Sequence, residues 1–178
     1  MRIISGKYKG RVLHPPVDNR ITRPTTDIAR EALFNILANQ IDLEETALVA
    51  DFFSGTGSVA LEFVSRGCGA VVAVELSGAY LPFINKTMMD LNIDNLKVVK
   101  SDVFKFITKT DLQFDLIFAD PPYALRNLKD LPDLIFNQNI LIPNGLLIIE
   151  HDNTTNFTAQ PRLTDHRKYG KAEFSFFR

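Results

Sequence analysis

Between residues 47 and 149 the chain alternates short apolar runs with helical patterns, and this alternation limits its possible folds more than any other feature. The apolar runs lie at residues 47–53, 71–74, 96–99, 114–119 and 146–149, and an alternating run follows at 171–177. Apart from Asp51, Lys97 and Asp115, the first five runs are apolar on both faces, which is typical of parallel strands covered on both sides. The sequence therefore predicts an α/β domain, with a mostly parallel sheet between two layers of helices.

The beginning of the chain has a different organisation. Two short apolar segments with glycines between them favour a β-hairpin. After it, Thr25 and Thr26 can cap a helix that continues to about Asn39. We therefore predict a hairpin-plus-helix extension over residues 1–40, prefixed to a main domain over residues 41–178.

The net charge of −1 hides an uneven distribution of charged side chains. Residues 1–30 carry a net +5, residues 31–160 carry −9, and residues 161–178 carry +3. A polyanion would be attracted to the two ends of the chain and repelled by its middle. Charged segments this short can equally be solvated ends with no partner, so composition alone leaves both interpretations open.

Other classes of protein are disfavoured by what the chain lacks. The single cysteine, Cys68, cannot form an internal disulfide or a multi-cysteine zinc site. No apolar run is long enough to span a bilayer, and the first residues lack a secretory signal. His14, His151 and His166 are scattered without a shared ligand spacing, so we expect surface or loop positions for them and no metal site. These observations predict a reduced, cytoplasmic, soluble protein.

The predicted strand ends carry the residues that could bind a ligand, because open α/β sheets bind ligands beyond the carboxyl ends of their strands. After the first strand, Gly55 and Gly57 allow a tight turn that a ligand can approach closely. Glu75 ends the second strand, 20 residues after Gly55, where a carboxylate can accept both hydroxyls of a ribose or remain a solvated acid. Asp102 follows the third strand and could contact an adenine amine or cap the next helix.

The most informative motif is Asp120-Pro121-Pro122-Tyr123, directly after the fourth strand. The two prolines restrict the backbone and remove two N–H donors, which leaves a stiff turn with free carbonyl acceptors. A carboxylate and a carbonyl can accept both hydrogens of a planar amine, and Tyr123 offers a ring on which a base can stack. A proline stop beside an exposed tyrosine explains this combination poorly.

The chain resembles a known family at these motifs and at several others. Residues 53–57 and 120–123 look like the two signature motifs of S-adenosylmethionine-dependent amino methyltransferases. Four further segments are similar to the RsmD family, whose members methylate the exocyclic N2 of a guanine in small-subunit ribosomal RNA; they lie at residues 2–11, 22–27, 30–34 and 169–171. The resemblance covers essentially the whole chain.

This resemblance implies a fold, a cofactor and a set of site residues. The expected fold is the class I methyltransferase (Rossmann-like) sheet of seven strands, with the last strand antiparallel. Asp51 and the turn of Ser54, Gly55 and Gly57 would hold the methionine end of S-adenosylmethionine, with Phe53 as a further cofactor contact. Glu75 would take the ribose hydroxyls and Asp102 the adenine, with Leu76 and Val103 beside it. Arg23 and Thr25 would help close the site, and Asp120, Pro121, Pro122 and Tyr123 would carry catalysis.

The expected substrate is 16S rRNA, within an assembled or assembling small ribosomal subunit. The basic hairpin would grip RNA phosphates through Lys7, Lys9 and Arg11, and we expect a monomer without membrane contact. Three other functions remain possible from the motifs. A DNA adenine-N6 methyltransferase shares Asp-Pro-Pro-Tyr but needs room for target recognition. A protein-glutamine methyltransferase favours Asn before the prolines, and a non-catalytic nucleotide-binding Rossmann module leaves residues 120–123 unexplained.

Overall fold

The computed structural model describes residues 1–16, 27–122, 125–170 and 172–178. Its elements in chain order are α1 (Asp27–Leu37), β1 (Leu48–Phe52), α2 (Ser58–Ser65), β2 (Ala70–Glu75), α3 (Leu81–Leu91), β3 (Leu96–Lys100), α4 (Val103–Ile107), β4 (Phe114–Ala119), η1 (Leu128–Asp130), α5 (Leu131–Asn137), β5 (Leu141–His151), β6 (Leu163–Tyr169) and β7 (Ala172–Phe177). The described strands form one seven-stranded sheet in the order β3-β2-β1-β4-β5-β7-β6.

The pairing of the strands confirms the predicted sheet. Strands β1 to β5 pair in parallel, whereas the last strand, β7, is antiparallel to both β5 and β6. The strand order reverses between β1 and β4, which is where ligands bind in such sheets. Phe52 at the end of β1 is in register with Val74 on β2 and Ala119 on β4. The loops that follow these three strands therefore meet at one edge of the sheet.

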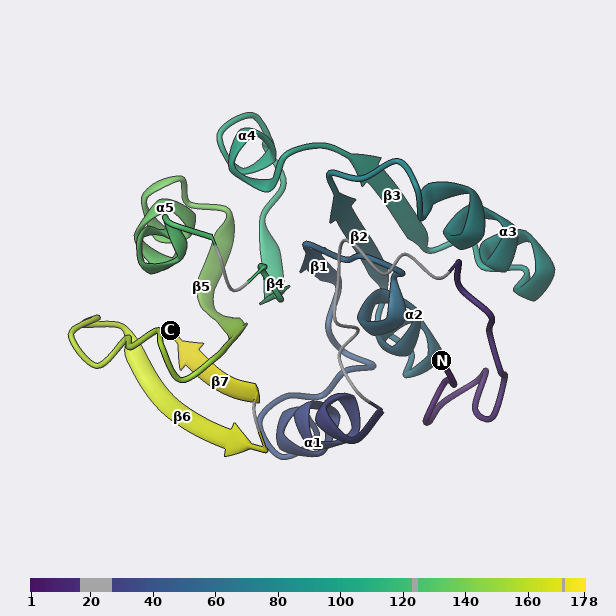
Figure 1. Ribbon diagram of the computed structural model, residues 1–178, viewed down its shortest axis with the longest axis horizontal. Coiled ribbons are helices and arrows are strands. Elements are labelled where there is room, and N and C mark those ends of the chain that lie inside the picture. Colours follow the sequence, from purple (N-terminus) through teal and green to yellow (C-terminus); the bar gives the residue numbers. More distant parts are fainter. Residues whose placement is uncertain (17–26, 123–124, 171) are drawn as a thin grey trace.

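The sheet is covered on both faces, and alternate residues of each strand enter two different cores. On β1, Val49 packs in the core that holds α1, α2 and α3, whereas Ala50 and Phe52 pack in the core that holds α4, η1 and α5. Figure 1 shows α1 and α2 on one side of the sheet and α4 and α5 on the other. Because both faces are buried, the central strands β1, β2, β4 and β5 are mostly apolar on both faces, as the sequence predicted.

Two strands differ from the sequence-based prediction. The sequence analysis did not locate β6, because its residues are mostly polar and exposed, as befits the edge strand of a sheet. The predicted run at 146–149 is the buried part of the longer β5. The start of that strand is irregular, with Asn144 at a φ of 65° and a register shift in its pairing with β4.

The predicted hairpin is also looser than a regular pair of strands. Within the described residues, its pairing is a single antiparallel bridge between Arg2 and Val12. The hairpin nevertheless packs on the domain, and this contact leaves the side chain of Ile3 only 2% exposed. The predicted helix that follows begins at Asp27 in the structure, and its proposed caps, Thr25 and Thr26, lie outside the described residues. In the described ranges, none of the helices combines the length and apolar character needed to cross a membrane.

Candidate active site

Three carboxylates meet at the carboxyl edge of the central strands, where the sequence placed its candidate residues. Asp51 on β1 is 1% exposed and Glu75 on β2 is 9% exposed, and Asp120 directly follows β4. Burial raises the pKa of Asp51 well above its usual range, and the negative charges of Asp120 and Glu75 raise it further. This edge therefore favours a ligand that carries positive charge.

The turn after β1 brings the backbone of the chain into the site. Phe53, Gly55 and Gly57 have φ values of 60°, 51° and 73°, in the left-handed region that glycine adopts most readily. The N–H of Gly57 donates to the carbonyl of Ser54 at 2.7 Å, which closes the turn immediately before α2. The N–H of Ala60 donates to Asp51 Oδ2 at 2.9 Å. The carboxylate of Asp51 thus ties the end of the strand to the first turn of the helix.

The carboxylate of Glu75 is held between two backbone amides. Its Oε2 accepts from the N–H of Gly55 at 2.8 Å, and its Oε1 accepts from the N–H of Ser77 at 2.6 Å. A carboxylate has about four lone-pair sites, so each oxygen keeps acceptor capacity for a ligand. The first of these bonds also ties the glycine turn to the adjacent strand.

Two features of the turn fit a bound cofactor. Among the described residues, the buried hydroxyl of Ser54 has no hydrogen-bond partner, and such groups are costly unless a ligand or water satisfies them. Among the described residues, and apart from its two chain neighbours, no atom lies within 4 Å of the position that a Cβ on Gly55 would take. The backbone at Gly55 therefore faces space that a ligand can occupy.

The residues expected at the adenine lie beside the glycine turn, at the ends of β2 and β3. The side chain of Leu76 is 65% exposed, which is unusual for a large apolar residue and suits the wall of a ligand site. Asp102 caps α4, since its Oδ1 accepts from the N–H of Lys105 at 2.9 Å. Val103 is buried beneath it. Helix capping is one of the two roles that the sequence left open for Asp102, the other being adenine binding.

The proline turn continues β4 directly. The N–H of Asp120 donates to the carbonyl of Phe52 at 3.2 Å, so this residue extends the parallel pairing by one position. The carbonyl of Pro122 accepts from the N–H of Leu125 at 2.8 Å. Tyr123, like Arg23 and Thr25, lies outside the described residues. The structure therefore places Asp120 at the site and describes the turn up to Pro122.

The basic residues of the hairpin lie in a segment that packs on the end of α2, where the N–H of Lys7 donates to the carbonyl of Ser65 at 2.6 Å. Lys7, Lys9 and Arg11 are exposed, and within the described part of the chain none of them forms an ion pair. Arg2 is a fourth exposed cation of the same hairpin, which the sequence analysis did not select as an RNA contact. Its position among the other cations of the opening segment is the sequence feature that could have added it to that selection.

The expectation of scattered surface histidines was wrong for His151. This residue is 1% exposed on β5, and the sheet brings it next to His166 and Glu173, with one donor atom from each within 4.8 Å of the others. His151 Nδ1 lies 2.8 Å from the carbonyl of Asp152 and must donate to it, so Nε2 accepts from the Ser175 hydroxyl at 2.8 Å. Burial lowers the pKa of His151, which keeps this ring neutral.

The partners of Glu173 complete this polar cluster. Its carboxylate oxygens contact His166 Nε2 at 3.0 Å and Lys168 Nζ at 3.1 Å. The hydrogen bonds and ion pairs of the described residues thus account for the arrangement. These residues meet because β5, β7 and β6 are neighbours in the sheet. They are separated in the sequence, so nothing in the sequence indicates that they lie close together.

The reversed strand order, the glycine turn and the carboxylates at strand ends define a class I, S-adenosylmethionine-dependent methyltransferase. The chain belongs to the family described as Conserved hypothetical protein 95, which matches residues 1–178. The resemblance to the RsmD family is thereby confirmed.

Individual relatives agree with this assignment. The chain is 33% identical to ribosomal RNA small subunit methyltransferase D of Buchnera aphidicola subsp. Baizongia pistaciae, over 99% of this chain and 91% of that protein. It is 32% identical to the Escherichia coli protein of the same name, over 85% of this chain and 75% of that protein. The solved structure of yhhF from Escherichia coli superposes with a TM-score of 0.85 at 27% identity, covering 99% of this chain and 96% of the other.

Proposed function

We propose that this chain methylates the exocyclic N2 amine of a guanine in 16S rRNA. The observation that carries the proposal is the position of Asp120, which directly follows β4, at the sheet edge where Asp51 and Glu75 end their own strands. The names of the relatives support the substrate, because both are ribosomal RNA small subunit methyltransferases that match most of the chain. A carboxylate beside a proline-turn carbonyl suits an amine as the methyl acceptor, which supports the same substrate.

The proposed cofactor residues fit a cationic ligand with a methionine end and a nucleoside end. Asp51 and the turn over residues 53–57 would hold the methionine end, with the unpartnered hydroxyl of Ser54 available to it. Glu75 would accept the ribose hydroxyls, and the exposed Leu76 would lie beside the adenine. Asp102 and Val103 would contact the adenine, and Arg23 and Thr25 would close the site. Bound S-adenosylmethionine supplies an electrophilic methyl group on a positively charged sulfur.

The proposed role of Asp120 follows from the nature of the substrate amine. The lone pair of guanine N2 is delocalised into the ring, which makes the amine a poor nucleophile. The Asp120 carboxylate and the Pro121 carbonyl would accept its two hydrogens, so that the nitrogen becomes pyramidal and its lone pair available. Pro122 would stiffen the turn, and Tyr123 would stack on the base. As the N–C bond forms and the C–S bond breaks, Asp120 would stabilise the charge that moves onto nitrogen.

The proposed RNA contact is the hairpin. Lys7, Lys9 and Arg11 are exposed cations without ion-pair partners among the described residues, so they are available to phosphates. The guanine must leave its stack to reach the proline turn, so we expect a target in an accessible loop of the small subunit. We further propose that the chain acts as a monomer in the cytoplasm; size-exclusion chromatography with light scattering tests the oligomeric state.

The decisive experiment offers radiolabelled S-adenosylmethionine with four acceptors: unmethylated small subunits, naked rRNA, duplex DNA and total protein. We expect label on RNA, recovered after digestion as N2-methylguanosine. Asp120→Ala should lower the rate by about 10²–10³ while cofactor affinity is kept. Label on DNA or protein would contradict the substrate, and cofactor binding without transfer to any acceptor would contradict catalysis on these acceptors.

The RNA contact has its own test. Replacing Lys7, Lys9 and Arg11 with Ala should weaken RNA binding and reduce the slope of log K against log salt by about 2–3, since each phosphate contact contributes about 0.7–0.9. A matched control removes three exposed lysines elsewhere, Lys86, Lys97 and Lys109, with the same change in net charge. Equal effects of the two triple variants would contradict a specific role for the hairpin.

A further inference from the structure

The two sides of the N-terminal hairpin, residues 1–13, pair over only a few residues. Around the bridge between Arg2 and Val12, the N–H of Ile3 donates to the carbonyl of Arg11 at 3.0 Å and the N–H of Leu13 donates to the carbonyl of Met1 at 2.9 Å. The N–H of Gly10 donates to the carbonyl of Ile3 at 2.9 Å. An isolated two-stranded hairpin is only marginally stable in water. The position of its cations therefore depends on what holds the hairpin to the domain.

One carboxylate on α2 provides much of that attachment. Glu62 is fully buried, and its Oε2 accepts from the N–H of Ile4 at 2.8 Å. Its Oε1 accepts from the N–H of Ser5 at 3.0 Å and from Arg66 Nε at 2.8 Å. Hydrogen bonds to a charged group are about twice as strong as neutral ones. Two consecutive backbone amides of the hairpin are thus fixed by a single side chain of the helix.

Ser65, almost one turn further along α2, holds the turn of the hairpin. Its Oγ accepts from the N–H of Tyr8 at 3.0 Å and donates to the carbonyl of Ser5, while its own carbonyl accepts from the N–H of Lys7 at 2.6 Å. Gly6, with a φ of 78°, lies so close that a Cβ on it would be 1.7 Å from the Ser65 carbonyl oxygen. The contact therefore requires glycine at this position of the hairpin.

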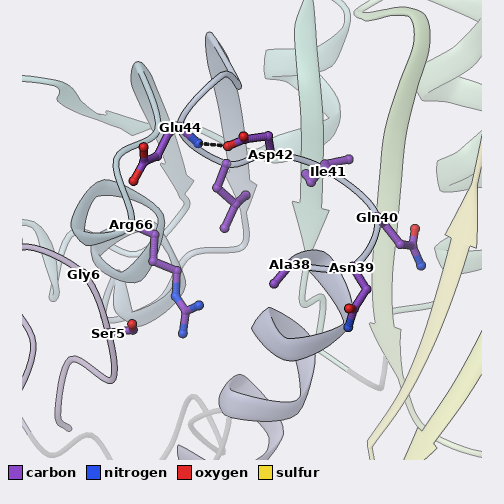
Figure 2. Close-up of a pocket in the computed structure, with 10 residues that line it drawn as sticks. Ser5, Gly6, Ala38, Asn39, Gln40, Ile41, Asp42, Glu44 and Arg66 are labelled. Carbon is purple, nitrogen blue, oxygen red and sulfur yellow. Dashed lines mark hydrogen bonds between the residues drawn. The ribbon is translucent and has the colours of Figure 1, made fainter.

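Arg66 links the same contact to the rest of the domain. Besides its bond to Glu62, its guanidinium lies over the ring of Phe34 on α1, at 4.5 Å from the centroid. Figure 2 shows Arg66 beside Ser5 and Gly6, where they form one wall of an open pocket whose other wall is residues 38–44. The turn of the hairpin thus lies against the end of α2, and Arg66 connects this contact to α1.

The other end of α2 begins at the cofactor turn. The helix starts directly after Gly57, and its 8 residues span about 12 Å. The hairpin runs alongside this helix, since Thr56 Oγ1 lies 3.7 Å from Met1 Sδ at one end, while Lys7 contacts Ser65 at the other. A rigid helix therefore connects the proposed cofactor turn to the hairpin that carries the cations.

We infer that Glu62 and Ser65 are positioning residues for RNA: they lock the basic hairpin to α2 and so set the distance between its cations and the reacting site. This inference rests on the proposed function. Among the described residues, the side-chain hydrogen bonds of Glu62 go to the hairpin and to Arg66, and none goes to the proposed cofactor residues or to residues 120–122. Replacing Glu62 therefore weakens RNA recognition, which depends on the hairpin, and leaves the cofactor site unchanged.

Glu62→Gln tests the inference with minimal change of shape. One carboxylate oxygen becomes an amide NH₂, which faces backbone N–H donors and cannot accept from them. We expect kcat/KM for rRNA to fall about tenfold or more, mainly through KM, with the cofactor Kd unchanged. The salt slope of RNA binding should fall toward that of the triple hairpin variant. Thr87→Val is the matched control, because Thr87 is a buried helix side chain that bonds the Phe83 carbonyl, away from the hairpin.

A double-mutant cycle distinguishes positioning from general loss of stability. When Lys7, Lys9 and Arg11 are already Ala, adding Glu62→Gln should cost little further RNA affinity, since the hairpin then has few charges to place. Full additivity of the two changes would overturn the inference, as would an RNA affinity unchanged by Glu62→Gln. If Glu62→Gln fails to bind cofactor, Ser65→Ala carries the same test.

Failure of this inference can be distinguished from failure of the proposed function. If the wild-type chain methylates no RNA, the proposed function fails, and hydrogen exchange of amides 3–11 still reports the anchor. Faster exchange there in Glu62→Gln than in Thr87→Val shows that Glu62 holds the hairpin, and equal exchange overturns the anchoring.

Discussion

Asp51→Asn should make the protein more stable and bind its cofactor less well. The carboxylate of Asp51 is 1% exposed, and burial together with the charges of Asp120 and Glu75 raises its pKa well above the usual value. Asn keeps the volume of the side chain and an oxygen that can accept from the N–H of Ala60, but it carries no charge. The substitution therefore removes electrostatic strain while leaving the local hydrogen bond in place.

The magnitude follows from the linkage between pKa and stability. A carboxyl group whose pKa is raised in the folded state loses stability as pH rises from its unfolded pKa to its folded pKa, at about 1.4 kcal/mol for each unit of difference. Because the pKa of Asp51 is raised well above 3.8, we expect Asp51→Asn to be more stable than the wild type at pH 8, by on the order of 1 kcal/mol or more. For a chain of this size 1 kcal/mol corresponds to about 2–4 °C in Tm, and the gain should shrink toward pH 5.

Urea denaturation and thermal melts between pH 5 and pH 8 measure this gain. Asp115→Asn is the matched control, because Asp115 Oδ2 accepts a similar bond from the N–H of Leu48 at 2.8 Å, at the start of β1 rather than at the site. A second readout is stabilisation by S-adenosylmethionine at 100 times the wild-type Kd, which should fall from about 2.7 to about 1.4 kcal/mol if affinity drops tenfold. A gain that does not depend on pH, or a wild type that is more stable at pH 8, would refute the reasoning.

Three further predictions concern other parts of the chain. Gly57→Ala places a Cβ 3.2 Å from Ile84 at a φ of 73°, so urea denaturation should show a loss of about 1–3 kcal/mol, and no loss would mean that the turn relaxes freely. Because burial lowers the pKa of His151, its contribution to stability should be complete above pH ~6.5 and decline below it; His151→Gln should flatten this decline between pH 7 and pH 5, and an unchanged profile would contradict it. Burial raises the pKa of Cys68 to about 12, so iodoacetamide should label this thiol only after unfolding, and rapid labelling of the native protein would count against the buried position.

The sequence by itself determined the architecture and the local chemistry of the strand ends. Apolar runs such as 114–119 must be buried on both faces, and the loops that follow parallel strands must meet at one edge. These constraints predicted the sheet and placed Asp51, Glu75 and Asp120 at one end of it. They hold because strand, turn and cap preferences act over a few residues, which a sequence displays directly.

The tertiary structure alone decided which distant residues become neighbours. The hairpin amides find the carboxylate of Glu62 almost 60 residues away, and β7 brings Glu173 next to His151. The exposed edge strand β6 gave no apolar pattern to detect, and the raised pKa of Asp51 exists only where other charges converge on a buried site. Burial and charge–charge contacts depend on distances in space, and those distances are set by how the whole sheet and its helices pack.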